Sequence, residues 1–132
     1  MADEIYQATL GSALLIPSGP NNKLHLYFAI TDCCVDDRHL LVSITSIPPN
    51  GHYDQTCLIS AGEHDFIKHA SYTLYRKPEI YSATKISRFV ALNYFKVLPS
   101  ASESLIDRIS LGILESDFTP QYHQNYYKEQ IV

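Results

Sequence analysis

Residues 25–31 (His-Leu-Tyr-Phe-Ala-Ile-Thr) and 39–46 (His-Leu-Leu-Val-Ser-Ile-Thr-Ser) form two runs rich in aromatic and β-branched side chains. Such runs are typical of β-strands, and the Asp36-Asp37 pair between them suits a hairpin-like connection. Further strand-forming runs cover residues 8–16, 56–59 and 71–75. Many short strands at intervals of about ten residues predict a mainly β fold, a small barrel or a strongly bent sheet.

The C-terminal part of the chain has a helical pattern. Ser100 and Glu103 have the spacing of a capping box, in which both side chains satisfy the first backbone groups of a helix. The apolar residues that follow recur at helical spacing: Leu105, Ile106, Ile109 and Ile113. They predict an amphipathic helix packed on the barrel. The sequence therefore predicts an α+β domain over residues 1–118, with a polar tail over residues 119–132, whereas residues 79–86 fit either a strand or a helix.

Composition limits where the protein can act. Hydrophobic residues make up 45% of the 132 residues, a globular composition, but no apolar run approaches the roughly 20 residues that cross a membrane. The N-terminal Met-Ala-Asp-Glu is acidic where a secretory signal is basic. Three cysteines, an odd number, do not make a disulfide framework. These features predict a cytoplasmic protein with no membrane partner.

Charge is distributed unevenly along the chain. The formal net charge is -4, yet residues 68–96 carry six Lys and Arg against a single acidic residue, Glu79. This segment fits a basic zone that binds a short nucleic-acid strand. It also fits a solvated face with mixed neighbours, because residues close in sequence need not share a surface.

The order of these segments resembles the PemK/MazF-type growth-inhibitor toxins and their ToxN-like relatives. The resemblance rests on Asn22-Lys23 ahead of the aromatic strand, on residues 41–46 ending in Thr-Ser, and on residues 71–85 before the helix. It implies a small SH3-like barrel with a C-terminal helix. It also implies an endoribonuclease that needs no metal or other cofactor, forms a homodimer and is silenced by a protein or RNA antitoxin. Two segments depart from the family: residues 17–22 carry no charge, and residues 62–69 have no counterpart.

Cleavage of RNA without a metal needs a base for the 2′-hydroxyl, an acid for the departing 5′-oxygen and groups that hold the phosphate charge. His64 is the first candidate for the acid or base, because it follows Gly62 in a predicted loop. Thr45 and Ser46 place two hydroxyls at a strand end, and Lys23 is a candidate cation. Each also has a structural interpretation, as a capping histidine, turn hydroxyls and a loop lysine.

The candidate RNA-binding residues are Tyr75, Arg76, Lys77 and His69. Tyr72, Tyr75 and Tyr81 are candidates for stacking on unpaired bases, with Arg76 and Lys77 beside the RNA backbone. His69 is a candidate second proton-transfer group or an ordinary surface residue. Tyrosines in a small barrel more often fill its core.

Three alternatives remain open from the sequence. Cys57, His64 and His69 could bind zinc, although their spacing matches no standard finger. Cys57 and His64 could form a nucleophile pair, although Cys57 lies in an apolar run that favours an inert buried thiol. The chain could also be a non-enzymatic barrel module that binds a protein partner through its Tyr-rich surface.

Overall fold

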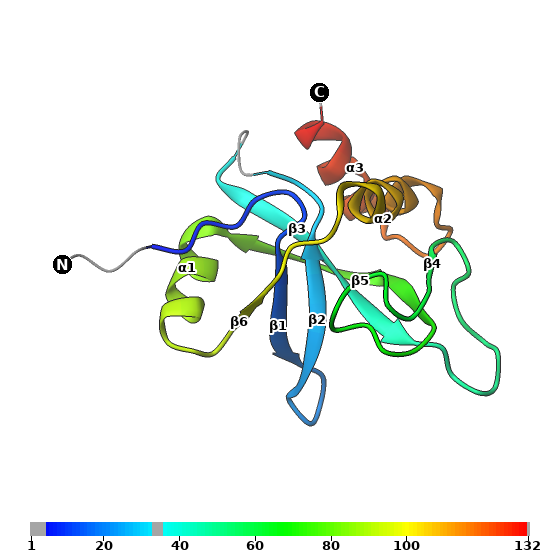
Figure 1. Ribbon diagram of the computed structural model, residues 1–132. Helices are drawn as coiled ribbons and strands as arrows, with labels where there is room; N and C mark the ends of the chain where they lie inside the picture. The colour runs from blue at the N-terminus through cyan, green and yellow to red at the C-terminus, as the bar shows by residue number, and fades with distance from the viewer. Residues whose placement is uncertain (1–4, 33–35, 132) are drawn as a thin grey trace.

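The computed structural model describes residues 5–32 and 36–131 of the protein. Six antiparallel strands in the order β4-β5-β3-β2-β1-β6 form one sheet, which curls into a half-barrel (Figure 1). The strands are β1 (Ala13–Ser18), β2 (Lys23–Ala29), β3 (Arg38–Ser46), β4 (Leu58–Ile59), β5 (Ser71–Ser82) and β6 (Lys96–Leu98). The helices are α1 (Ala83–Ala91), α2 (Glu103–Glu115) and α3 (Gln121–Gln130). The predicted mainly β, α+β class is confirmed, whereas expectations for Cys33, Cys34 and residues 1–4 lie outside the described residues.

The two runs that predict strands form β2 and β3, which pair antiparallel with Leu26 opposite Ile44. The first strand begins later than predicted, at Ala13. The reason is a turn before it, in which Gly11 has a φ of 91° and the Ser12 hydroxyl accepts a hydrogen bond from the Thr9 amide at 2.8 Å. A positive φ is readily adopted by glycine and interrupts a strand.

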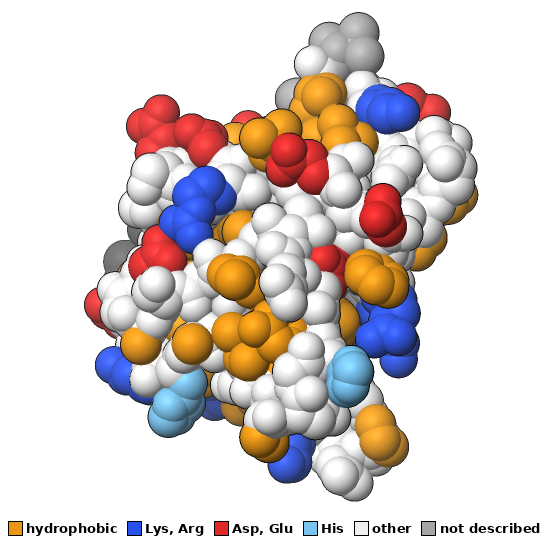
Figure 2. Space-filling model, turned by 90° about the vertical axis from the view of Figure 1, so that its right-hand side faces the viewer, with side chains coloured by type: hydrophobic (Ala, Val, Ile, Leu, Met, Phe, Trp, Pro, Cys, Tyr) orange, Lys and Arg blue, Asp and Glu red, His pale blue; other side chains and the backbone are white. Residues whose placement is uncertain are grey.

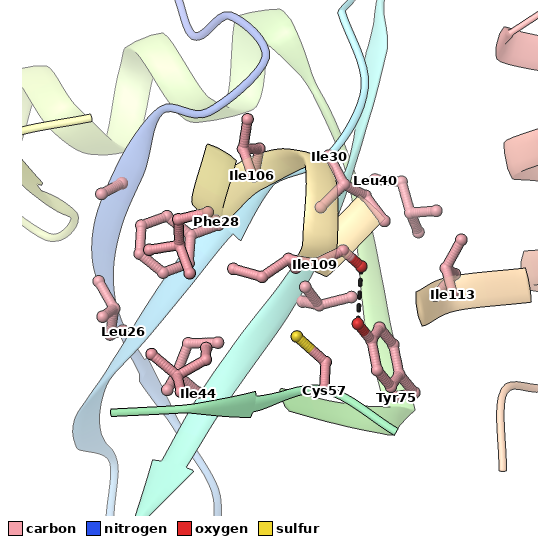
Figure 3. Close-up of a cluster of buried hydrophobic side chains, with 14 of the residues drawn as sticks. Leu26, Phe28, Ile30, Leu40, Ile44, Cys57, Tyr75, Ile106, Ile109 and Ile113 are labelled. Atoms are coloured by element: carbon pink, nitrogen blue, oxygen red, sulfur yellow. Dashed lines mark hydrogen bonds between the residues drawn. The ribbon is translucent and has the colours of Figure 1, made fainter. Parts of the chain in front are cut away.

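The concave face of the sheet carries the main core. Phe28 and Tyr75 from the sheet and Ile109 and Ile113 from α2 are fully buried and lie together there (Figure 3). The predicted apolar stripe of α2 is therefore confirmed. Residues 119–132, expected as a polar tail, contain α3, and this helix adds two tyrosines to the same core, Tyr126 and Tyr127.

A second core covers the opposite face of the sheet. Leu14 and Leu41 point to this side and pack with Ile86 of α1 and with Phe95. The segment that fitted either a strand or a helix divides at Ser82, whose hydroxyl accepts from the Lys85 amide at 3.0 Å and caps α1. With apolar residues on both faces, β1 to β3 are buried almost throughout, so their sequences read as nearly continuous apolar runs.

The start of α2 differs from the prediction. Ser102 is the N-cap, with its hydroxyl accepting from the Leu105 amide at 3.2 Å, and Glu103 is the first helical residue. Ser100 lies outside the helix, because the next residue, Ala101, donates its amide to the Gly11 carbonyl at 2.9 Å. That bond ties the chain to the N-terminal turn before the helix begins.

A large bulge interrupts β5. Leu41 pairs with Glu79 and Ser43 pairs with Leu74, so four residues of β5, 75–78, lie opposite the single residue Val42. Pro78 lacks a backbone N–H and is tolerated in a strand only at such irregular positions. Tyr75 follows Thr73 by strand alternation onto the concave face and is buried there, whereas Arg76 and Lys77 lie within the bulge and are exposed.

Candidate functional site

A hollow opens where β2 and β3 separate. Their pairing ends at Leu26 and Ile44, although β2 starts at Lys23 and β3 continues to Ser46. Figure 1 shows the two strands diverging from this point, with the segment before β5 lying across the opening. The hollow, called here the β2–β3 hollow, has a volume of about 570 Å³. Its polar lining consists of His25, Thr45, Ser46, Lys68, His69 and Ser71.

Residues 60–70, the closing loop, form one wall of the β2–β3 hollow. The loop folds back on itself, because the Gly62 amide donates to the Ile67 carbonyl at 2.8 Å and the Ile67 amide donates to the His64 carbonyl at 2.9 Å. At its far end the Ile47 amide donates to the Ala70 carbonyl at 3.0 Å. The buried Ile67 side chain anchors the loop in the concave core. Lys68 and His69 are thus presented from a fixed backbone.

An ion pair joins the closing loop to α2. Glu63 bonds the Arg108 guanidinium and accepts from the Ser60 amide at 2.7 Å, while Arg108 also donates to the Leu58 carbonyl at 2.7 Å. The Arg108 hydrogen bond, followed by that of Ser60, lowers the pKa of Glu63 below its ordinary value. Because the folded-state pKa is depressed, this stabilisation is present above the ordinary glutamate range and is lost as pH falls through the lowered value.

His64 lies inside the protein and not in the hollow. The residue is 6% exposed; its Nε2 donates to the Pro99 carbonyl at 2.6 Å, and its Nδ1 accepts from the Phe66 amide at 3.0 Å. The ring is edge-on to Phe28 at a centroid distance of 5.3 Å. Both nitrogens are engaged, so neither is available to a substrate. The geometry does not support the sequence interpretation of His64 as catalytic acid or base, and it favours the structural one.

Replacing His64 by alanine is expected to lower the free energy of unfolding by about 2–4 kcal/mol, because it leaves a cavity and two buried backbone groups without partners. Urea unfolding followed by circular dichroism measures the change. The exposed His52 provides the matched control, and its alanine variant is expected to stay within about 0.5 kcal/mol of the parent. Equal stability of the two variants would contradict the structural role of His64.

Thr45 and Ser46 border the hollow but face opposite sides of the sheet. Ser46 pairs with Ser71 and Thr45 pairs with Tyr72, and successive strand residues alternate between faces. Their hydroxyls therefore diverge, and the predicted joint grip on one phosphate oxygen is not supported. Ser46 is exposed on the side of the closing loop, while Thr45 is half-buried on the other side.

Two histidines border the β2–β3 hollow, but they come from different elements and from opposite sides of the sheet. His25 pairs with Ile16 on the face of the second core, whereas the closing loop covers the concave face. His69 is exposed on the closing loop beside the exposed Lys68. His25 is half-buried on β2, where its Nδ1 is 2.7 Å from the Ser18 hydroxyl, leaving Nε2 unengaged by that bond. The sequence analysis placed His25 in a strand and assigned no function to it. Because His25 comes two positions after Lys23 in β2, both side chains lie on the same face of this strand.

Lys23 is exposed at the first residue of β2 and is not part of the lining. It lies opposite Ser18 in the β1–β2 pairing, and Ser18 also contacts His25. The structure therefore does not bring Lys23, Thr45 and His64 into one cleft. It places His25, not His64, next to Lys23.

The predicted RNA-binding residues also separate. Tyr75 is fully buried, its hydroxyl donates to the Ile109 carbonyl at 2.7 Å, and burial raises the pKa of its phenol well above the ordinary value (Figure 3). It offers no face to a base, so that prediction is wrong: strand alternation puts Tyr75 on the concave face with Thr73, where α2 covers it. Arg76 and Lys77 are both exposed, but Lys77 lines neither the β2–β3 hollow nor a hollow beside Arg76, so the structure does not support its RNA-binding role. Arg76 lines a second hollow of about 380 Å³, the Tyr53–Tyr72 hollow.

The basic segment is dispersed over the fold. Lys68 and Arg76 lie near the β4–β5 end of the sheet, whereas Lys96 lies on β6 at the opposite edge. Lys85 lies on α1 with its ammonium 4.3 Å from the centroid of the Tyr81 ring. The segment therefore supplies separate cations and not one continuous basic zone.

Two of the three residues of the zinc alternative, Cys57 and His64, which are also the residues of the thiol alternative, are not presented to a substrate. Cys57 is 6% exposed in the concave core, and both nitrogens of His64 are bonded to backbone groups. Within residues 5–32 and 36–131, no three His, Cys, Asp or Glu side chains gather as a metal-binding group. None of the helices in this part of the chain has the length and apolarity to span a membrane.

No protein-family model matches this chain, and no curated protein matches its sequence. The interpretation of the site therefore rests on its own residues.

Proposed function

We propose that the protein is a toxin-like endoribonuclease that cleaves single-stranded RNA without a metal at the β2–β3 hollow. The proposal includes the SH3-like form of the barrel, a homodimer and silencing by a protein or RNA antitoxin, all implied by the resemblance to growth-inhibitor toxins. The observation that carries the activity is the meeting of the His69 imidazole with Lys68 and the Ser46 hydroxyl on the closing-loop side of one hollow.

These side chains match the requirements of RNA cleavage. The His69 imidazole takes the proton of the 2′-hydroxyl, and the resulting alkoxide attacks the phosphorus. The Lys68 ammonium gives a proton to the departing 5′-oxygen as its bond to phosphorus breaks. The Ser46 hydroxyl stabilises the charge that develops on the non-bridging oxygens. The products are a 2′,3′-cyclic phosphate and a 5′-hydroxyl end, and proton uptake and release balance within each turnover.

The size and polarity of the β2–β3 hollow suit a segment of RNA. Its volume of about 570 Å³ falls within the roughly 300–1,000 Å³ of small-molecule sites. Leu26, Ile44 and Ile67 give it an apolar base, which suits a ribose or base face. A cation beside an imidazole, Lys68 beside His69, suits the phosphate.

The direct test incubates the purified protein with a labelled pool of single-stranded RNA and an excess of chelator. We expect cleavage that persists with chelator and leaves cyclic phosphate and 5′-hydroxyl ends, while DNA of the same sequence is spared because it lacks the nucleophile. Absence of cleavage from every RNA pool by folded protein would overturn the proposal. Loss of cleavage on chelation alone would favour metal chemistry.

A non-enzymatic protein-binding module is the second candidate function, and exposed apolar side chains favour it. Leu58, Phe66 and Phe118 are 43%, 46% and 55% exposed. Figure 2 shows hydrophobic side chains gathered in the middle of one face, with Lys and Arg side chains at its flanks. This candidate becomes the better account if no RNA is cleaved and the folded protein captures a partner through these three residues.

A further inference from the structure

We propose that the Tyr53–Tyr72 hollow is a subsite for one unpaired nucleobase with an exocyclic amino group, next to the cleavage site. This inference rests on the proposed function and deepens it. The subsite is built from three segments: the β3–β4 connection supplies Tyr53 and Asp54, β5 supplies Tyr72 and Arg76, and the α2–α3 connection supplies Phe118.

Aromatic rings form the walls of this hollow. The Tyr53 and Tyr72 rings are tilted by 34° with centroids 5.4 Å apart, which fixes the Tyr53 ring against the sheet. Phe118 is 55% exposed, so much of its ring is open to a ligand. Rings bordering a hollow of about 380 Å³ suit a planar base, because every base has a π-face that stacks on aromatic side chains.

Arg76 supplies the charge that a nucleotide needs. It is exposed on the β5 bulge and takes part in neither of the ion pairs found within residues 5–32 and 36–131, Arg38–Asp36 and Arg108–Glu63. A guanidinium without an acidic partner can bond a phosphate or stack on a base. Arg76 therefore distinguishes this hollow from a purely apolar docking site.

The Asp54 carboxylate can recognise the hydrogen-bonding edge of the base. Its Oδ1 accepts from the Thr56 amide at 2.9 Å and from the Thr56 hydroxyl at 2.5 Å, and its Oδ2 accepts from the Ser116 hydroxyl at 2.6 Å. These bonds hold the carboxylate in one orientation on the wall of the hollow. A carboxylate accepts hydrogen bonds from amino groups, which adenine, cytosine and guanine carry and uracil lacks.

The two hollows lie on either side of the same strands. Ser71 lines the β2–β3 hollow and the next residue, Tyr72, lines the Tyr53–Tyr72 hollow. Thr45, opposite Tyr72 in the sheet, borders the first hollow as well. An RNA strand that passes over the end of β3 and β5 therefore contacts both, with cleavage on one side and base recognition on the other.

The test titrates the full chain with AMP, CMP, GMP and UMP and follows backbone amide shifts by NMR. We expect the shifts to centre on Tyr53, Tyr72 and Arg76, with UMP binding more weakly than the other three. Arg76→Ala and Phe118→Ala are each expected to weaken binding of CMP by about 5-fold or more, since a stacked base contributes that much to affinity. Lys77→Ala is the matched control, with affinity expected within twofold, because Lys77 is an exposed neighbour outside the lining.

The failure of this inference is distinguishable from failure of the proposed function. RNA cleavage without nucleotide binding at these residues, or equal affinity in the Arg76, Phe118 and Lys77 variants, would overturn the subsite and leave the nuclease. Nucleotide binding with the expected variant pattern, but no cleavage of any RNA, would remove the nuclease and leave a nucleotide-binding site. Equal affinity for UMP and CMP would overturn the role of Asp54.

Discussion

Replacing His69 by alanine is expected to reduce RNA cleavage by about 10²- to 10⁴-fold, the usual contribution of a proton-transfer group. His69 is exposed on the closing loop and lines the β2–β3 hollow, so its removal costs little packing. The free energy of unfolding is therefore expected to stay within about 0.5 kcal/mol of the parent. Initial cleavage rates of one labelled RNA, measured beside urea unfolding curves, give both quantities.

Two further histidine variants separate catalysis from stability. His25→Ala is expected to keep most of its cleavage rate, because the His25 side chain lies on the other face of the sheet, with Ile16 and Tyr27. His64→Ala is expected to lower the free energy of unfolding. It is expected to reduce cleavage only because the closing loop is then held less firmly. Full activity in His69→Ala would contradict the proposed site.

Replacing Gly112 by alanine is expected to destabilise the protein by about 3 kcal/mol. Gly112 lies in α2 against the buried Tyr75 ring, and a Cβ there would lie 2.5 Å from Tyr75 Cζ and would overlap the hydroxyl oxygen. The ring is fully buried, so overpacking displaces it and breaks its hydrogen bond to the Ile109 carbonyl. Urea unfolding measures the loss.

The sign of this effect should reverse when the ring is removed. In a Tyr75→Leu background the colliding atoms are absent, and alanine has a higher helix propensity than glycine by about 0.8–1.0 kcal/mol. Gly112→Ala is therefore expected to stabilise the Tyr75→Leu protein by roughly 0.5–1 kcal/mol. Destabilisation of similar size in both backgrounds would show that the Tyr75 ring is not the cause.

The strands and the C-terminal helix follow closely from local pattern. Residues 25–31 and 39–46 predicted β2 and β3, and Leu105, Ile106, Ile109 and Ile113 predicted the buried face of α2. These predictions succeed because alternation and helical spacing depend on neighbours within a few residues. The tyrosine-rich tail, by contrast, gave no clear apolar stripe, and α3 forms because Tyr126 and Tyr127 pack on the concave core.

The candidate site was predicted only in part. Thr45, Ser46 and His69 do border one hollow, but the role given to an imidazole passes from His64 to His69. A histidine after a glycine in a loop has the same local sequence whether its ring faces solvent or the core. The separation of β2 from β3, which creates the hollow, depends on pairing between distant segments. The sequence of neither strand contains a pattern that predicts it.

By itself, the sequence determined the mainly β class, the two central strands and the helix that packs on them, because hydrophobic periodicity is a local property. Only the tertiary structure decided which polar side chains share a hollow and which are buried. Helix α2 covers Tyr75 on the concave face of the sheet, and the Pro99 carbonyl accepts a hydrogen bond from His64 across 35 positions of the chain. Such contacts depend on where the folded chain brings distant segments together, and no local pattern encodes them.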